Sequence, residues 1–253
     1  MGHTKKERLD CRLHKQLPHM SRQHIQAWIM RGAVRVDGRV VTKPGTMIGP
    51  DAVLQCDIEE PKFVSRAGFK LEKALDEFGI NVTELVVLDA GISTGGFTDC
   101  LLQRGAAKVF GVDVGYGQVH EKVRGDPRVV LMERTNLRHL DPAQLGEQVD
   151  IVTLDLSFIS LLKVLDVVAR ALKPGGQLVA LIKPQFEAER HEIGRGGIVR
   201  DDAVRKKIVD RVVEAIEKQG FACQGVVPSP ILGGSGNQEF LAYFRLEGAS
   251  CGP

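Results

Sequence analysis

A glycine-rich turn directly after a short apolar run is the first pattern in the sequence that could hold a ligand. The run leads into Asp89, and glycines follow at positions 91, 95 and 96. Glycines let the backbone pass close to a ligand before the next helix begins. The G-x-x-x-G-G spacing departs from the G-x-G-x-x-G of dinucleotide sites, which disfavours an oxidoreductase. Asp113 ends a second apolar run 22 residues after Gly91 and could accept hydrogen bonds from a ribose diol.

Four charged residues at the ends of expected elements form a second candidate group: Lys70, Asp155, Lys183 and Glu239. If neighbouring strands carry Asp155 and Lys183, the two side chains can converge on one substrate atom. A sugar hydroxyl is a poor nucleophile, and attack on a sulfonium methyl requires it to be held in line and relieved of its proton. Burial would lower the pKa of a lysine and let it act as a base, whereas flanking carboxylates favour the charged form of the lysine. Because these four groups would titrate together, the sequence does not show which of them carries the proton.

Ordinary structural roles remain open for these residues. Asp89 would also fit a helix N-cap, and Lys70 a solvated helix residue. Glu239 would fit a charge that protects an edge strand. Lys183 and Asp155 could form a simple ion pair.

From residue 69 onward, helical periodicity alternates with short apolar runs. The predicted helices span 69–78, 95–104, 159–172 and 202–218, and the predicted strands span 85–88, 109–112, 129–132, 151–154, 178–182, 221–227 and 240–244. This alternation predicts an α/β fold with an open, mostly parallel sheet covered on both faces. Ligands bind such sheets beyond the carboxyl ends of the strands.

The first 60 residues predict a small, basic α+β module. Residues 8–31 fit two short helices, with Ser21 as an N-cap, and Asp37-Gly38 fits the turn of a hairpin. Residues 1–50 hold ten Lys and Arg against three acids, a net charge of +7, which points to a polyanion partner. We therefore expect a module at 1–60, a linker at 61–68 and a larger domain at 69–253.

Composition narrows the class of protein. The chain of 253 residues is 43% hydrophobic and 26% charged, which is ordinary globular composition. Its longest apolar stretches fall short of a membrane helix, its N-terminus lacks the apolar core of a secretory signal, and no metal-ligand spacing is present. The five cysteines, the last of them Cys251, are expected to be reduced thiols. These features predict a cytoplasmic protein, or one from an organelle stroma after removal of a transit peptide.

The glycine-rich turn and Asp113 resemble the cofactor site of S-adenosylmethionine-dependent methyltransferases, which have a Rossmann-like sheet. This resemblance implies S-adenosylmethionine as the cofactor. The residues that it assigns to the cofactor are Asp89, Gly91, Ser93, Thr94, Gly95, Gly96 and Asp113.

The ordered Lys, Asp, Lys and Glu resemble the catalytic tetrad of FtsJ-type ribose 2′-O-methyltransferases. An enzyme that methylates an exocyclic amine would instead resemble [D/N]-P-P-[Y/F]. Asp155-Leu156-Ser157-Phe158 has the ends of that motif but neither proline. Methylation of an RNA base therefore remains the alternative reaction.

The N-terminal module resembles the S4 RNA-binding domain, and the whole chain closely resembles the TlyA family. The residues that the resemblance assigns to RNA are Arg12, Arg22, Arg31, Arg35 and Lys43. Members are known as hemolysins or as ribosomal RNA cytidine 2′-O-methyltransferases. The resemblance implies ribosomal RNA or a ribosomal subunit as partner, without membrane or DNA. A membrane-active hemolysin and an RNA-binding protein without activity are the rival functions.

Overall fold

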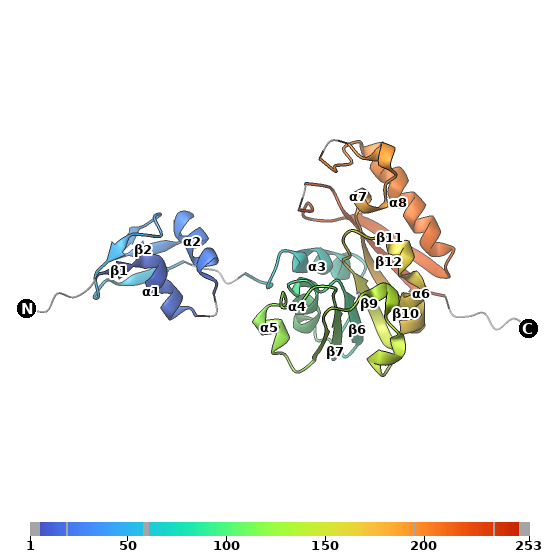
Figure 1. Ribbon diagram of the computed structural model, residues 1–253, viewed down its shortest axis with the longest axis horizontal. Helices are drawn as coiled ribbons and strands as arrows, with labels where there is room; N and C mark the ends of the chain where they lie inside the picture. Colours follow the sequence, from blue (N-terminus) through green and yellow to red (C-terminus); the bar gives the residue numbers. More distant parts are fainter. Residues whose placement is uncertain (1–5, 19, 58–60, 195, 235, 248–253) are drawn as a thin grey trace, which may run out of the picture. The chain divides into compact units, whose positions relative to one another are not determined.

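The computed structural model describes residues 6–18, 20–57, 61–194, 196–234 and 236–247 (Figure 1). The chain divides into two compact units, Met1–Pro61 and Lys62–Pro253. Each unit has its own hydrophobic core.

The N-terminal unit packs two short helices against short antiparallel strands. Its elements are β1 (Glu7–Arg8), α1 (Leu9–Gln16), α2 (Arg22–Met30), β2 (Val34–Val36), β3 (Arg39–Val40), β4 (Met47–Ile48) and β5 (Leu54–Cys56). The Ser21 side chain accepts the His24 N–H and caps α2, as predicted. Asp37 and Gly38 have φ angles of 49° and 77°, which a two-residue hairpin turn requires. The pairing of β1 with β4 was not predicted because two-residue strands show no periodicity.

The C-terminal unit is built on a seven-stranded sheet with the order β11-β12-β10-β9-β6-β7-β8. Its strands are β6 (Val86–Ala90), β7 (Lys108–Val112), β8 (Val129–Met132), β9 (Val149–Leu154), β10 (Leu172–Ile182), β11 (Phe221–Pro228) and β12 (Phe240–Leu246). β12 alone runs opposite in direction to the other six strands of the sheet. The predicted open, mostly parallel sheet is therefore confirmed.

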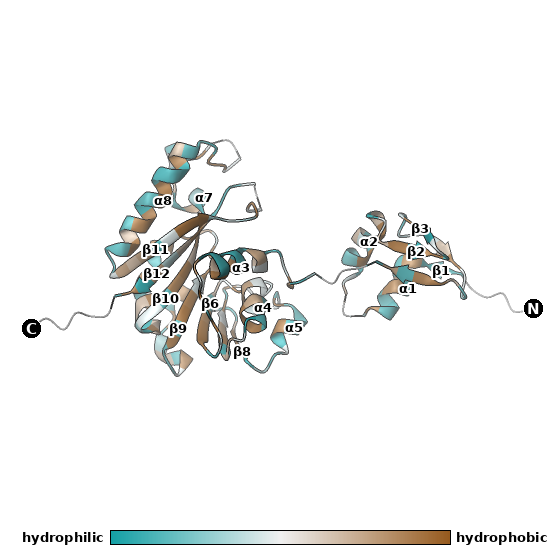
Figure 2. Cartoon of the chain, turned by 180° about the vertical axis from the view of Figure 1, so that it is seen from behind, coloured by the Kyte–Doolittle hydropathy of each residue, from teal (hydrophilic) through white to brown (hydrophobic). Residues whose placement is uncertain are grey.

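Helices cover both faces of this sheet (Figure 1). They are α3 (Ala67–Glu77), α4 (Gly96–Gln103), α5 (Glu121–Arg124), α6 (Leu165–Ala171), α7 (Pro184–Glu187) and α8 (Asp202–Glu217). α3 and α4 pack with Ile151 on one face, whereas α6 and α8 pack with Val152 on the other. Neighbouring strand residues thus enter opposite cores, and Figure 2 shows the central strands as largely hydrophobic.

Two segments differ from their sequence-based prediction. The helix expected at 159–172 consists of a 3-10 turn, Leu161–Lys163, followed by α6. Residues 62–68, expected as part of the linker, pack on the C-terminal unit because Phe63 is buried and the Val64 N–H donates to Asp99 Oδ2 at 2.8 Å. Helix α3 consequently begins at Ala67, two residues before its predicted start.

The four cysteines that the structure describes are free thiols, and Cys251 lies outside the described residues. Burial raises the pKa of the Cys100 thiol to about 12, so this side chain is an inert part of the core. Within the described part of the chain, no helix has the length and apolar character needed to cross a membrane.

Candidate active site

Four parallel strands, β6, β7, β9 and β10, end at one edge of the sheet. The predicted site residues that follow these strand ends are Gly91, Asp113, Asp155 and Lys183. Because β12 is antiparallel to β10 and pairs Phe240 with Ile182, Glu239 lies at the same edge. Lys70 approaches from helix α3, and α3 packs against β12. The fold therefore gathers residues from positions 70 to 239 in one place.

The four charged residues form two short ion pairs. Lys70 Nζ donates to Glu239 Oε2 at 2.6 Å, and both side chains are almost fully buried. Lys183 Nζ lies 2.6 Å from Asp155 Oδ1, again with little exposure. Each buried charge thus has a partner of opposite sign, which offsets much of its desolvation. The pairing joins each lysine to one carboxylate.

All four residues line one cavity of about 310 Å³. A second cavity, of about 600 Å³, is lined by Asp113, Val112, Asn136 and neighbouring residues. We call the first the tetrad cavity and the second the cofactor cavity. The residues that line both are Gly91, Ser93, Asp155, Ser157 and Phe158. A ligand in one cavity can therefore meet a ligand in the other at the Asp155 loop.

The turn after β6 requires glycine at position 91. Gly91 has a φ angle of 88°, and a Cβ there would lie 2.5 Å from the backbone oxygen of Asp155. Ser93, also at positive φ, donates its N–H to Asp113 Oδ2 at 2.8 Å. The other carboxylate oxygen of Asp113 accepts the Gly115 N–H at 2.7 Å. Asp113 thus fixes two loops at the rim of the cofactor cavity.

Four of the predicted cofactor residues do not line either cavity: Asp89, Thr94, Gly95 and Gly96. A Cβ on Gly96 would lie 2.2 Å from Ser65 Oγ, so this glycine allows α4 to approach the segment before α3. Gly95 has a φ of 96° and contacts Val123. Gly95 and Gly96 thus have a role in packing and chain direction. A contact with the cofactor stays a prediction for all four residues.

Asp89 is fully buried beneath the turn. Its two carboxylate oxygens accept hydrogen bonds from the hydroxyls of Thr98, at 2.6 Å, and Thr153, at 2.9 Å. Burial raises the pKa of this carboxyl from its ordinary value of 3.8 to about 6, although both hydroxyl contacts oppose the rise. Asp89 therefore ties β6 to α4 and β9 from below the site.

The structure adds three residues that the sequence analysis did not assign. Ser157 accepts a hydrogen bond from Lys183 Nζ at 2.9 Å. Phe158 is 90% exposed, and its ring centroid lies 5.1 Å from that of Phe186. Gln185 lines the tetrad cavity, and its buried Oε1 has no hydrogen-bond partner among the described residues. The sequence signal that could have found these three residues is their position, because each lies within two or three residues of Asp155 or Lys183 in the chain.

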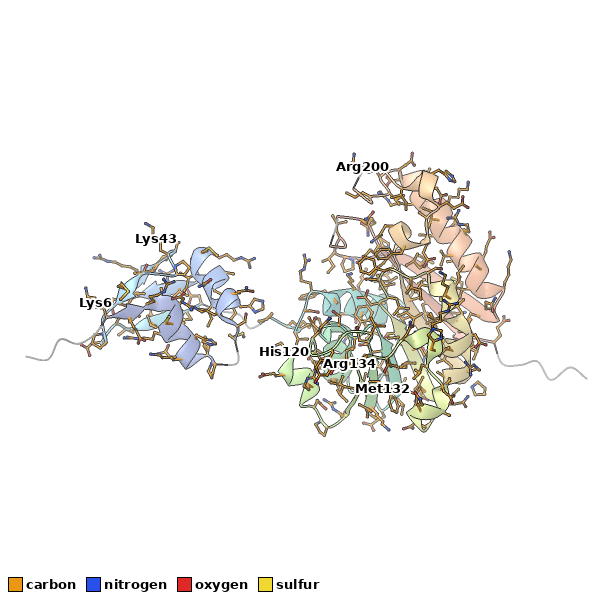
Figure 3. All side chains as sticks on the ribbon, viewed as in Figure 1. Lys6, Lys43, His120, Met132, Arg134 and Arg200 are labelled. Atoms are coloured by element: carbon orange, nitrogen blue, oxygen red, sulfur yellow. The ribbon has the colours of Figure 1, made fainter. Side chains whose placement is uncertain are left out.

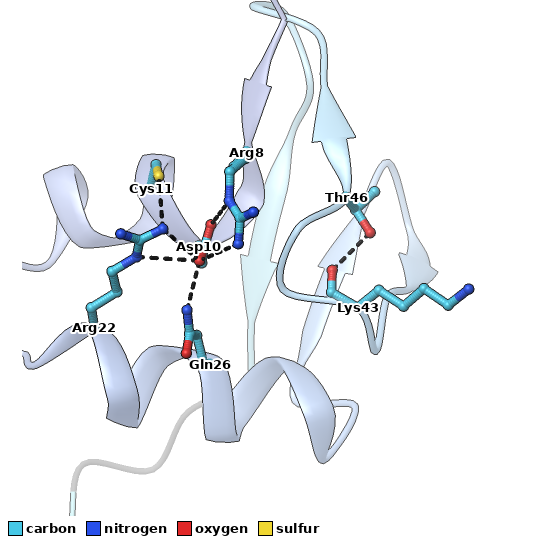
Figure 4. A network of polar contacts seen from close by, with 7 residues as sticks. All are labelled: Arg8, Asp10, Cys11, Arg22, Gln26, Lys43 and Thr46. Atoms are coloured by element: carbon cyan, nitrogen blue, oxygen red, sulfur yellow. Dashed lines mark hydrogen bonds and ion pairs between the residues drawn. The ribbon is translucent and has the colours of Figure 1, made fainter.

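Two of the five predicted RNA-binding residues, Arg12 and Arg22, each form several hydrogen bonds within the N-terminal unit. Arg12 donates to Glu7 Oε1 at 2.6 Å and to the Pro50 backbone oxygen at 3.0 Å, and its side chain is only 13% exposed. Arg22 donates to the buried Asp10, which also accepts from Arg8 and Gln26 (Figure 4). Arg8 is the main reason that the pKa of Asp10 lies well below its usual range.

The other three predicted RNA-binding residues, Arg31, Arg35 and Lys43, are exposed, as is Arg22. Arg35 lies 3.4 Å from the exposed Asp57, a contact that solvent screens. Lys43 projects from the N-terminal unit (Figure 3) and extends away from the polar network around Asp10 (Figure 4). Its backbone oxygen accepts a hydrogen bond from the Thr46 hydroxyl, which fixes the loop that carries it.

Comparison with known proteins identifies both units. Residues 63–246 match the FtsJ-like methyltransferase family, and residues 7–54 match the S4 domain. The chain is 42% identical to the 16S/23S rRNA (cytidine-2′-O)-methyltransferase TlyA of Mycobacterium tuberculosis, over 96% of this chain and 91% of that protein. The chain belongs to the TlyA family of FtsJ-like methyltransferases. Its methyl donor is therefore S-adenosylmethionine.

Other TlyA-family relatives carry a different name. Hemolysin A of Brachyspira hyodysenteriae is 42% identical over 94% of this chain and its own full length. The solved structure of a "putative hemolysin" from Streptococcus thermophilus is 41% identical, with a TM-score of 0.74 over 96% of this chain and 90% of that chain. The FtsJ-like unit and the S4 domain are thus shared by proteins with both names.

Proposed function

We propose that the protein transfers a methyl group from S-adenosylmethionine to the ribose 2′-hydroxyl of a cytidine in ribosomal RNA. The observation that carries the proposal is the junction of the two cavities at Asp155 and Ser157, beside Lys183. The cytidine and the ribosomal RNA follow from the relatives named for that reaction.

The residues of the cofactor cavity fit the proposed donor. S-adenosylmethionine supplies a methyl group on a positively charged sulfur, which leaves as a neutral thioether. Asp113 offers a carboxylate to a ribose diol, and the glycine turn at Gly91 leaves room beside the Asp155 loop. We propose Gly91, Ser93 and Asp113 as the cofactor residues in direct contact.

In the tetrad cavity, we propose that Lys183 contacts the reacting hydroxyl. Its ammonium, held by Asp155, can donate to the 2′-oxygen and stabilise the negative charge that develops as the oxygen loses its proton. Lys70 and Glu239 line the tetrad cavity but not the cofactor cavity. We assign them to orientation of the ribose, because a hydroxyl must be held in line with the methyl group to react.

The exposed cations of the S4 unit would bind RNA phosphates. Such contacts supply affinity and register more than base specificity. We propose Arg31, Arg35 and Lys43 as the phosphate contacts, with Arg12 and Arg22 reassigned to the integrity of the unit. We propose the cytoplasm as the site of action, because the relatives named for this reaction are bacterial proteins that act on ribosomal RNA.

The test is transfer of labelled methyl from S-adenosylmethionine to RNA, followed by digestion to nucleosides. Substrates are free 16S and 23S RNA and isolated 30S and 50S subunits that lack the modification. Label in 2′-O-methylcytidine supports the proposal, and comparison of the substrates identifies the partner. Label on a base would instead establish base methylation, and lysis of erythrocytes by a Lys183→Ala variant without transfer activity would establish a separate hemolytic function.

A further inference from the structure

Lys183 is held by two acceptors on the same loop, and only one of them is a charged group. Asp155 Oδ1 lies 2.6 Å from Lys183 Nζ, and Ser157 Oγ lies 2.9 Å from it. By contrast, Glu239 is the acceptor for Lys70 Nζ, at 2.6 Å. The two lysines of the tetrad cavity therefore differ in how firmly they are oriented.

A lysine ammonium has three N–H donors in tetrahedral directions. A single contact would let the ammonium of Lys183 pivot about the Asp155 oxygen. The hydrogen bond to Ser157 restrains that pivot and so restrains the directions of the remaining N–H groups. Because Lys183 lines the tetrad cavity, a ligand oxygen there can accept the third N–H.

Ser157 lies where this orientation matters. It lines both cavities, whereas Lys183 lines only the tetrad cavity. Ser157 is exposed, so its hydroxyl contributes little to the folded core. The Asp155–Ser157 loop therefore holds Lys183 beside the junction of the two cavities, where the methyl group and the hydroxyl oxygen must meet.

We propose that Ser157 is a positioning residue for methyl transfer, which acts by fixing the direction in which Lys183 donates to the ribose 2′-oxygen. This inference rests on the proposed function. In the reaction, the C–O bond forms as the S–C bond breaks, and the hydroxyl proton leaves to solvent or to the tetrad. Ser157 forms no bond in this sequence and changes only the probability that Lys183 is aligned.

The first test compares Ser157→Ala, Ser157→Thr and wild type in steady-state methyl transfer. Loss of one hydrogen bond to a charged group should lower kcat about 10-fold, with KM for RNA and for S-adenosylmethionine unchanged. Threonine retains the hydroxyl, and the exposure of position 157 leaves room for its methyl group, so Ser157→Thr should restore most of kcat. Ser160→Ala is the matched control, because Ser160 bonds to Glu187 and lines neither cavity.

The second test needs no activity. Trace acetylation of the free protein at one fixed pH, read by mass spectrometry, compares Lys183 with Lys70 in the same cavity. Loss of the Ser157 contact should raise the labelling ratio of Lys183 to Lys70 several-fold, whereas Ser160→Ala should leave it unchanged. An unchanged ratio in Ser157→Ala would overturn the proposal, as would a rise in KM at constant kcat, which would make Ser157 a substrate contact. If wild type transfers no methyl, the proposed function fails, and the labelling ratio still decides whether Ser157 orients Lys183.

Discussion

The backbone oxygen of Asp155 occupies the space that a Cβ on Gly91 would need, 2.5 Å from its ideal position. The loop that carries Asp155 can thus cross the turn after β6 only where no side chain intervenes. Gly91→Ala should destabilise the C-terminal unit by about 2–4 kcal/mol, from left-handed backbone strain plus steric overlap. It should also displace Asp155 and reduce methyl transfer. Urea unfolding and a transfer assay measure the two effects.

Gly146→Ala is the matched control for this substitution. Gly146 has a φ of 79° but no atom within 4 Å of its ideal Cβ, so it carries the backbone strain without the overlap. We expect a cost of about 1 kcal/mol and no loss of transfer. Equal losses of stability in Gly91→Ala and Gly146→Ala would show that the Asp155 loop can move away from the added Cβ at no cost in stability.

Lys183→Ala should reduce kcat by roughly 10²-fold or more, because it removes the donor proposed to act on the hydroxyl. Affinity for S-adenosylmethionine, measured by calorimetry, should stay within about twofold of wild type, because Lys183 lines only the tetrad cavity. The exposed Lys207 on α8 provides a control, Lys207→Ala. Retained transfer in Lys183→Ala would remove Lys183 from the chemistry.

Asp113→Ala should weaken S-adenosylmethionine binding about 10-fold or more. The substitution removes the acceptor proposed for the ribose and releases the backbone N–H groups of Ser93 and Gly115. Calorimetric titration measures the loss, with Asp210→Ala on the exposed face of α8 as the control. Wild-type affinity in Asp113→Ala would place the cofactor ribose elsewhere.

The raised pKa of Asp89, about 6, predicts a specific pH dependence of stability. Between about pH 4 and pH 6, the folded protein keeps a proton that the unfolded chain has released. The contribution of Asp89 to the free energy of unfolding is therefore present at low pH and lost as pH rises through 6. Asp89→Asn should remove this pH-dependent change in the free energy of unfolding, which is on the order of 2–3 kcal/mol. Urea unfolding of both proteins at pH 4.5 and pH 7 measures it, and parallel pH profiles would contradict the prediction.

Arg12 and Lys43 should differ in what their loss affects. Lys43→Ala should weaken RNA binding and lower the slope of log affinity against log salt by about one, the effect of a single phosphate contact. Arg12→Ala should instead lower the thermal stability of the N-terminal unit, because it breaks contacts with Glu7 and the Pro50 oxygen. Filter binding at several salt concentrations and thermal unfolding separate the two effects. If Lys43→Ala keeps the salt dependence of wild type, the Lys43 ammonium is solvated and does not contact a phosphate.

The predicted strands β6, β7, β9 and β12 were recognisable because their apolar runs are long enough to show a pattern. The two-residue strands β1 and β4 and the four-residue helices α5 and α7 were not, since so few residues carry no periodicity. The prediction of a single helix at 159–172 was wrong at its start, where Ser160 caps a 3-10 turn and donates a hydrogen bond to Glu187 at the end of α7. That contact is tertiary, so local pattern could not reveal it.

The glycines of the turn show the same limit within the site. The sequence marks positions 91, 95 and 96 as lacking side chains, but it does not say what occupies the freed space. The structure gives that space to the Asp155 backbone at Gly91, to Val123 at Gly95 and to Ser65 at Gly96. A glycine required for packing and a glycine required for a ligand look identical until the surrounding chain is in place.

The sequence by itself determined the α/β class, the basic N-terminal module and the four charged residues, because periodicity, net charge and residue chemistry are local properties. Only the tertiary structure decided that Lys70 pairs with Glu239, 169 residues away, and Lys183 with Asp155. That choice follows from β12 lying antiparallel beside β10, which brings Glu239 to the edge where the parallel strands end. Strand order and register depend on packing of the whole sheet, and no single segment encodes them.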